Sequence, residues 1–164
     1  NNKMKEMTMN KLTITAVTTA LLSFGIAGNA MADKHAFNDA ESAVEYRQNA
    51  LSIMRDNFAA MGDMVKGDVA FDAAIFQQRA EDFARLSHIP WAGFSVDGAM
   101  PGDNTDALPE IWDNWDDFKQ RTVDFTADAE KLAEVAAGGS LDDIKPVFMA
   151  AAKNCKGCHD NYKD

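Results

Sequence analysis

Two thiols and one imidazole lie within five residues of one another near the end of the chain, at Cys155, Cys158 and His159. This Cys-x-x-Cys-His pattern is the attachment signature of a c-type haem, in which the thiols add across the haem vinyl groups and the imidazole binds the iron. On a helix, Cys155 and His159 share one face and Cys158 lies one turn from Cys155. One helix can then hold both the porphyrin and its metal.

Three other roles for the cysteine pair agree less well with the sequence. A thioredoxin-like redox pair is expected after a strand of a βαβ unit, and no such pattern precedes residues 155–158. A zinc site needs further ligands, but the chain has two cysteines and its other histidines, His35 and His88, lie far away in sequence. A disulfide between the two cysteines would close too small a loop to add much stability. The sequence therefore predicts one covalent haem c.

Residues 1–32 have the features of an export signal. Lys5 and Lys11 precede an apolar run over residues 12–26, and Ala30-Met31-Ala32 offers small residues at both positions that a signal peptidase recognises. An uncleaved membrane anchor is the alternative, but the run is short and rich in threonine for a span of about 20 residues. We expect cleavage after this tripeptide and a periplasmic mature protein, because c-type haem is attached outside the bacterial inner membrane.

Residues 33–164 have the size of one domain, and they are acidic. The full chain carries 16 Lys and Arg against 26 Asp and Glu, a net charge of −10, and the expected leader contains three lysines and one glutamate. The rest therefore has 13 basic and 25 acidic residues and a charge of −12. This charge argues against nucleic acid or an anionic membrane as partner. It favours a soluble exported domain, without stable membrane insertion, that meets a neutral or basic partner.

Apolar residues in this domain repeat at the spacing of helices that pack side by side, and four helices are expected. The first covers residues 39–65, the second begins with Asp72 as N-cap and runs to about His88, the third starts at Pro109, and the fourth follows Gly138-Gly139. The predicted fold is all-α, an antiparallel four-helix bundle with covalently bound haem.

The inward faces of the later helices follow from the same spacing. The second helix should bury Ile75, Phe76, Ala80, Phe83 and Ala84. The third should bury Ile111, Trp115, Phe118, Thr122, Phe125, Ala129, Leu132 and Ala136. The fourth carries both cysteines on its apolar seam, so the thiols should point into the bundle. Pro146 belongs in a first turn, which favours Asp143 over Ser140 as the N-cap of this helix.

Two further features concern the surroundings of the cofactor. Arg47 interrupts the apolar seam of the first helix. A buried cation is unfavourable unless it reaches water or meets an anion, so its side chain either extends past the bundle end or meets a haem propionate. The connection 89–107 is long and contains Trp91 and Phe94. Loops of this length usually have a function, so it either covers a cofactor edge or is a plain crossover.

Residues 38–163 resemble the cytochromes c′, c-type cytochromes whose haem motif lies at the C-terminus of a four-helix bundle. The resemblance rests on Ala43-Val44-Glu45-Tyr46-Arg47-Gln48 with Leu51 and Met54, Val65-Lys66-Gly67, Leu86 to Phe94 around Pro90-Trp91, Pro109-Glu110-Ile111-Trp112 with Phe118-Lys119-Gln120, and Cys155 to Lys163. It implies an antiparallel bundle, a homodimer formed through the first two helices, a periplasmic location and a five-coordinate haem iron.

The resemblance also implies roles for individual residues. Cys155 and Cys158 match the residues that form the thioethers, and His159 matches the only protein ligand of the iron. Three residues match haem-edge contacts: Arg47, Gln48 and Asp106. Leu51 matches the residue over the open iron face. Lys163 matches a basic residue beside the axial histidine, where arginine is usual.

Leu51 decides between the functions that the resemblance implies. Low-spin relatives carry a methionine there that fills the sixth coordination site, and leucine cannot ligate. We therefore expect a pentacoordinate iron that binds NO or CO and can transfer electrons to a redox partner that the sequence does not identify. The alternative is a low-spin electron-transfer cytochrome without gas binding, with Met54 as sixth ligand. No enzymatic activity is expected, because a peroxidase needs a distal acid–base group and the helix face around Leu51 presents none.

Overall fold

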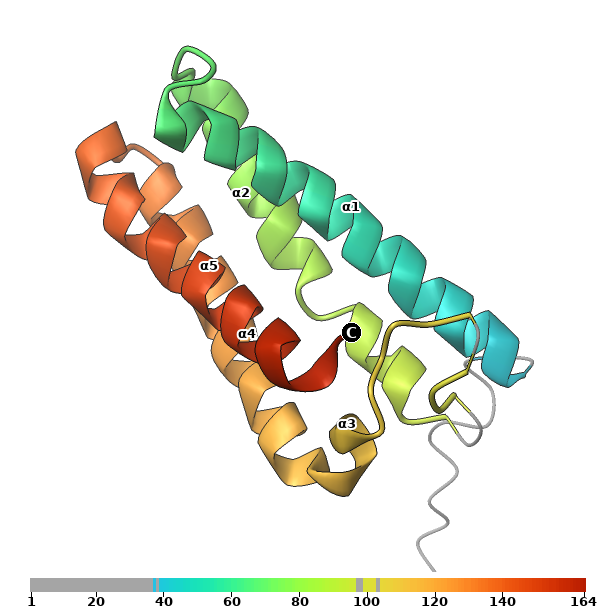
Figure 1. Ribbon diagram of the computed structural model, residues 1–164. Helices are drawn as coiled ribbons and strands as arrows, with labels where there is room; N and C mark the ends of the chain where they lie inside the picture. The colour runs from blue at the N-terminus through green and yellow to red at the C-terminus, as the bar shows by residue number, and fades with distance from the viewer. Residues whose placement is uncertain (1–36, 38, 97–98, 103) are drawn as a thin grey trace, which may run out of the picture. The chain divides into compact units, whose positions relative to one another are not determined.

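The computed structural model describes residues 37, 39–96, 99–102 and 104–164, all within the compact unit Met31–Asp164. The expected signal peptide lies outside the described residues. Four long helices form the bundle (Figure 1): α1 (Ala40–Lys66), α2 (Ala73–Leu86), α4 (Trp115–Ala136) and α5 (Leu141–Tyr162). A short 3₁₀ helix, η1 (Pro90–Phe94), and one short α-helix, α3 (Glu110–Asp113), lie in the connection between α2 and α4. The predicted all-α, antiparallel four-helix bundle is confirmed.

Local sequence signals set the ends of the first two helices. The carboxylate of Asp39 accepts the N–H of Ser42 at 2.7 Å at the start of α1. Gly67 ends this helix with a φ of 85°, in the left-handed region that favours glycine. The carboxylate of Asp72 accepts two N–H groups in the first turn of α2. The predicted ends at Gly67 and Asp72 are therefore confirmed.

Ser140 caps α5, so the prediction of Asp143 was wrong. The hydroxyl of Ser140 accepts the N–H of Asp143, and the Asp143 carboxylate accepts the N–H of Ser140 at 3.0 Å. This reciprocal pair satisfies two N–H groups that the helix itself leaves without partners. Its gain outweighs the loss of one hydrogen bond at Pro146, which lies inside the helix.

Two other sequence predictions need correction. The third helix is not continuous from Pro109, because Asn114 leaves the helical conformation between α3 and α4. Its side-chain amide donates to the carbonyl of Glu110 at 3.1 Å, in competition with the backbone ladder. Ile75 is 49% exposed. It lies about 100° around α2 from Phe76 and outside the buried stripe of this helix, which includes Phe76, Ala80, Phe83 and Ala84.

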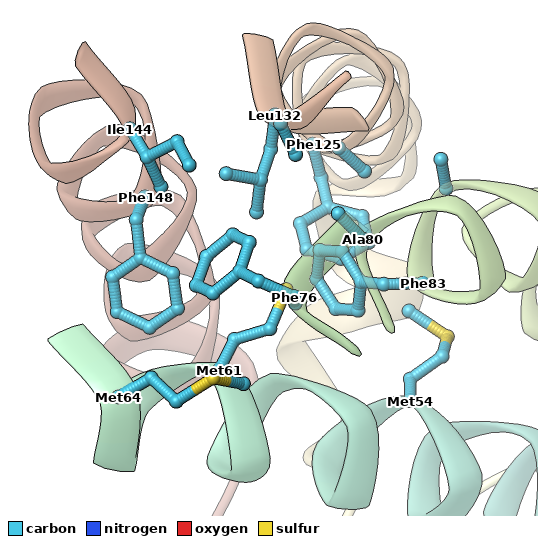
Figure 2. Close-up of a cluster of buried hydrophobic side chains, with 13 residues drawn as sticks. Met54, Met61, Met64, Phe76, Ala80, Phe83, Phe125, Leu132, Ile144 and Phe148 are labelled. Carbon is cyan, nitrogen blue, oxygen red and sulfur yellow. The ribbon is translucent and has the colours of Figure 1, made fainter. Parts of the chain in front are cut away.

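A tightly packed core fills the middle of the bundle and reaches the haem motif, because Cys155 packs against it. Figure 2 shows side chains of all four long helices pointing toward one another in it. Phe58 of α1 stacks on Phe148 of α5 with ring centroids 4.3 Å apart, and Phe83 of α2 meets Phe125 of α4 edge-on at 5.5 Å. Each large apolar side chain buried in this way contributes about 1.5–3 kcal/mol. This core fixes the spacing of the helices around the site, and part of it also lines the site.

The connection after α2 closes the end of the bundle that carries the haem motif. A Cβ added to Gly93 would lie 2.6 Å from the carbonyl oxygen of Ala43, so glycine lets η1 approach the α1 backbone. Further along, the N–H of Leu108 donates to the carbonyl of Tyr162 at 3.1 Å. The connection therefore contacts both the start of α1 and the end of α5.

Candidate haem site

A cavity of about 600 Å³ lies between α1, α2, η1, α4 and α5, at the end of the bundle that carries the Cys-x-x-Cys-His motif. Ligand pockets commonly have volumes of about 300–1,000 Å³. Its wall contains every residue that the sequence assigned to the cofactor: Arg47, Gln48, Leu51, Asp106, Cys155, Cys158, His159 and Lys163. The fold thus brings together side chains from the first helix, the long connection and the last helix.

The motif residues present two thiols and an imidazole to this cavity. Cys155 and Cys158 are free and partly buried. Burial raises the pKa of Cys155 to about 11 and also raises the pKa of Cys158. Burial, with a smaller effect of the nearby Lys163 cation, lowers the pKa of His159. At neutral pH the thiols are protonated and the imidazole is neutral, the form of histidine that binds metals.

The rest of the wall is mainly apolar. Leu51 faces the cavity from α1, and Met54, one turn further along and 3% exposed, also reaches it. The aromatic side chains of the wall are Phe58, Phe83, Trp91, Phe94, Phe118, Phe125 and Tyr162. A flat apolar ring system fits such a wall, because aromatic side chains bury large areas in stacked or edge-on contacts.

Arg47 is 1% exposed, so the alternative that its side chain extends past the bundle end was wrong. Its Nη1 donates to the carbonyls of Gly93 and Ala99 at 2.9 and 2.8 Å, and its Nη2 donates to Thr105 Oγ1 at 3.1 Å. The guanidinium lies over the Phe94 ring, 4.3 Å from its centroid. Burial lowers the pKa of Arg47 to about 10, so it remains a cation at neutral pH on the cavity wall.

The other two predicted edge residues, Gln48 and Asp106, contact or belong to the long connection. Gln48 Nε2 donates to the carbonyl of Asn104 at 2.6 Å, which holds the connection against α1. Asp106 and Lys163 form an ion pair at the cavity rim. The long connection therefore covers one edge of the cavity and is more than a plain crossover.

A polar cluster on α4 and α5 was missed by the sequence analysis. Arg121, on the cavity wall, donates from Nε to Asp117 at 2.6 Å and from Nη1 to the carbonyl of Gly157 at 3.2 Å. The Tyr162 hydroxyl donates to the same Asp117 carboxylate. Hydrogen bonds from Arg121 and Tyr162 lower the pKa of Asp117. The four-residue spacing of Asp117 and Arg121 is a local signal for their ion pair, but nothing in the sequence indicates the contact to Gly157.

Comparison with known proteins decides the family. A sequence model of the family described as cytochrome c′ matches residues 42–163. The chain belongs to the cytochrome c′ family. The cytochrome c′ of Halomonas halodenitrificans is 39% identical over 128 residues, which cover 75% of this chain and 96% of the relative. That of Alcaligenes xylosoxydans xylosoxydans is also 39% identical over 128 residues, covering 77% of this chain and 97% of the relative.

Solved structures of cytochromes c′ agree with the fold. That of the Shewanella frigidimarina protein is 43% identical in sequence, with a TM-score of 0.74 over 78% of this chain and 98% of that one. A ferrous variant of the Alcaligenes xylosoxidans protein with bound NO is 40% identical, with a TM-score of 0.71 over 78% of this chain and 98% of that one.

Cytochromes c′ bind one covalent haem c, so the predicted cofactor is confirmed at the level of the family. The donor set observed here fits that group: two protonated thiols and a neutral imidazole on one helix, an aromatic wall and a buried cation. When bound, the haem supplies an iron that can coordinate a small ligand or exchange an electron. None of the helices in the described part of the chain has the length and hydropathy of a membrane span.

Proposed function

We propose that the chain is a periplasmic haem protein whose pentacoordinate iron binds NO and CO and can also exchange electrons with a partner protein. One observation carries the proposal: Leu51, which has no ligating atom, lies on the wall of the same cavity as His159. The NO bound in a ferrous variant of the Alcaligenes xylosoxidans relative supports gas binding. No enzymatic activity is part of the proposal.

Each predicted site residue has a proposed task. Cys155 and Cys158 form the thioethers, and His159 is the axial ligand from the protein. Arg47 orients the cofactor through a haem propionate, because a buried guanidinium favours a charge-assisted hydrogen bond to a carboxylate. Further contacts at the haem edge come from Gln48 and Asp106, and Lys163 supplies a positive charge on the side of His159.

The proposed oligomer is a homodimer formed through α1 and α2. Apolar side chains on these two helices face solvent: Tyr46 is 41% exposed, Ile53 is 53% exposed and Ile75 is 49% exposed. A second copy that covers them would remove this apolar surface from water. The acidic surface of each copy favours a redox partner with a basic docking patch.

Met54 supports a second candidate function. Its thioether belongs to a side chain that is 3% exposed and also lines the cavity. If this sulfur fills the sixth coordination position, the protein is a low-spin electron-transfer cytochrome that binds no gas.

A visible absorption spectrum of the dithionite-reduced holoprotein, recorded before and after addition of CO, distinguishes the two candidates. We expect a broad, high-spin ferrous spectrum that shifts with CO, because Leu51 leaves the sixth position open. Leu51→Met serves as the six-coordinate reference. Sharp low-spin α and β bands that CO does not change in the unmodified protein would contradict the proposal and favour Met54 as ligand.

A further inference from the structure

A second hollow lies at the surface next to the haem cavity, and two side chains line both. The outer hollow has a volume of about 360 Å³ and lies between the end of α2, η1 and α4. Trp91 and Thr122 belong to the walls of both hollows. Val123 and Ala127 of α4 are exposed and line only the outer one. The Trp91 and Thr122 side chains thus form a partition between the outer hollow and the haem cavity, and the Trp91 ring is the larger part of it.

One hydrogen bond and a set of ring contacts hold this partition in place. The Trp91 indole N–H donates to the carbonyl of Ser87, at the end of α2, with 2.5 Å between the two heavy atoms. That carbonyl also accepts the Thr126 hydroxyl at 3.2 Å. The indole meets Phe118 and Phe125 edge-on, with centroids 6.1 and 5.9 Å apart. The indole also stacks on Phe94, with the two centroids 6.2 Å apart. These ring contacts and the single hydrogen bond define one position of the half-buried ring.

We propose that the outer hollow is an access site for small neutral diatomic gases, and that the Trp91 side chain is the gate between this site and the haem cavity. The proposal rests on the proposed function, since it gives the gas a second route besides direct entry into the haem cavity. The rim of the outer hollow is polar, since the exposed His88–Glu130 pair and the Thr126 hydroxyl also line it. Weakly hydrated gases favour apolar surface, which Val123, Ala127 and the indole provide there. Rotation of the ring needs the Ser87 hydrogen bond to break, and loop segments move on the nanosecond to microsecond scale.

The test uses CO recombination after flash photolysis of the reduced holoprotein. Trp91→Phe removes the hydrogen bond to Ser87 and should raise the bimolecular association rate about tenfold, the effect of a barrier lower by about 1.4 kcal/mol. Ala127→Trp fills the outer hollow from a position outside the haem cavity. It should slow association alone, and in the double variant it should cancel the gain of Trp91→Phe.

Two matched controls separate the gate from general effects. Trp112 also donates its indole N–H to a backbone carbonyl, that of Phe94 at 3.1 Å, but lines neither hollow. Ala150 is an exposed alanine of α5 that also lines neither. Trp112→Phe and Ala150→Trp should leave the CO association rate unchanged. If the double variant keeps the full gain of Trp91→Phe, that gain comes from a larger haem cavity and the gate is excluded.

A second readout does not depend on the reactivity of the iron. Xenon applied under pressure to the diamagnetic carbonmonoxy form should shift the indole N–H resonance of Trp91 and leave that of Trp112 in place. No shift at Trp91 would exclude the outer hollow as a gas site. If the reduced unmodified protein does not bind CO, the proposed function is contradicted. If all variants bind CO at equal rates, only the gate is contradicted.

Discussion

Lys163 and Asp106 form an ion pair, with 3.0 Å between Nζ and Oδ2. Next to it, the N–H of Asp164 donates to the carbonyl of Asp106 at 3.0 Å, and Ala107 pairs with Lys163 in a β-bridge. The end of the chain is therefore bound to the loop that covers the cavity edge. Asp106 was assigned to the haem edge and Lys163 to the side of His159, but they form one contact. A change in either residue should therefore affect both the haem edge and the side of His159.

Asp106→Asn should change the haem potential more than the stability. The paired side chains are 46% and 69% exposed, and exposed ion pairs contribute less than about 1 kcal/mol. Loss of a negative charge at the cavity rim favours the reduced iron, so the reduction potential should rise. Spectroelectrochemical titration and urea unfolding measure the two effects. Asp68→Asn, in the turn after α1, is the charge-matched control, and an equal rise of the potential there would contradict a local effect.

Arg47→Met should strongly destabilise the fold. The substitution removes three hydrogen bonds and leaves the carbonyls of Gly93 and Ala99 without their donor. Because hydrogen bonds to charged groups contribute about 1.5–3 kcal/mol each and do not add fully, we expect a loss of about 3 kcal/mol or more. Urea unfolding of the holoprotein measures it.

Arg55→Met is the control for this prediction. The Arg55 side chain is 73% exposed and pairs with its sequence neighbour Asp56, so its loss should change the free energy of unfolding by less than about 0.5 kcal/mol. Equal stabilities of the Arg47 and Arg55 variants would show that the Arg47 contacts do not hold the connection on α1.

The helices could be predicted because their signals are local. Steps of three and four between apolar residues define a buried face, and residues such as Gly67 and Asp72 mark ends through their own backbone or side-chain preferences. The N-cap of α5 was mispredicted because Pro146 and the reciprocal pair of Ser140 and Asp143 favour different starts. Only the formed hydrogen bonds show which of these wins.

The site could be predicted only in part. The two thiols and the imidazole could be predicted, because the Cys-x-x-Cys-His motif lies on one helix that fixes their spacing. The partners of Arg47 are 46, 52 and 58 residues away in sequence. These contacts depend on the close approach of η1 at Gly93, which no periodicity indicates. Likewise, the length of the connection with Trp91 and Phe94 left a cofactor cover and a plain crossover open, and only the cavity beside these residues decides between them.

Loss of both thiols should make the haem extractable. In the double variant Cys155→Ala/Cys158→Ala no thioether can form, so acidified organic solvent should remove essentially all of the pigment from the protein. The unmodified protein should keep its pigment, because a thioether survives this treatment. The absorbance of the solvent and protein fractions measures the outcome. Pigment that stays with the double variant would contradict thioether attachment at these residues.

Ser140→Ala should destabilise α5 at neutral pH by about 1 kcal/mol, as expected for the loss of an N-cap. Hydrogen bonds from Ser140 lower the pKa of Asp143 below its ordinary value of 3.8. The carboxylate therefore stabilises the fold fully above 3.8, and this contribution disappears as the pH falls through the lower folded-state pKa. The difference in the free energy of unfolding between the variant and the unmodified protein should thus become smaller in acid.

Thermal unfolding at neutral pH and well below 3.8 measures this prediction. Ser140→Thr, which keeps a capping hydroxyl, is the matched control and should retain most of the stability at neutral pH. A difference that is as large in acid as at neutral pH would mean that the Asp143 carboxylate takes no part in the cap.

Leu51→Ala should speed CO association, because it removes the aliphatic side chain that we place over the open iron face. A barrier lower by about 1.4 kcal/mol corresponds to about a tenfold faster rate. Leu51→Met should have the opposite effect, because a thioether can fill the sixth position and must leave before CO binds. Stopped-flow mixing of the reduced holoprotein with CO measures both rates.

Met54→Leu is the control that separates the two sulfur positions. Met54 lies one turn from Leu51 on the same wall, and leucine has a similar volume, so this substitution should change neither the spin state nor the CO rate. A shift from low to high spin in Met54→Leu would instead identify Met54 as the sixth ligand. If Leu51→Ala leaves the CO association rate unchanged and Met54→Leu changes neither the spin state nor that rate, the barrier to CO lies elsewhere. Trp91 then becomes the residue that controls access.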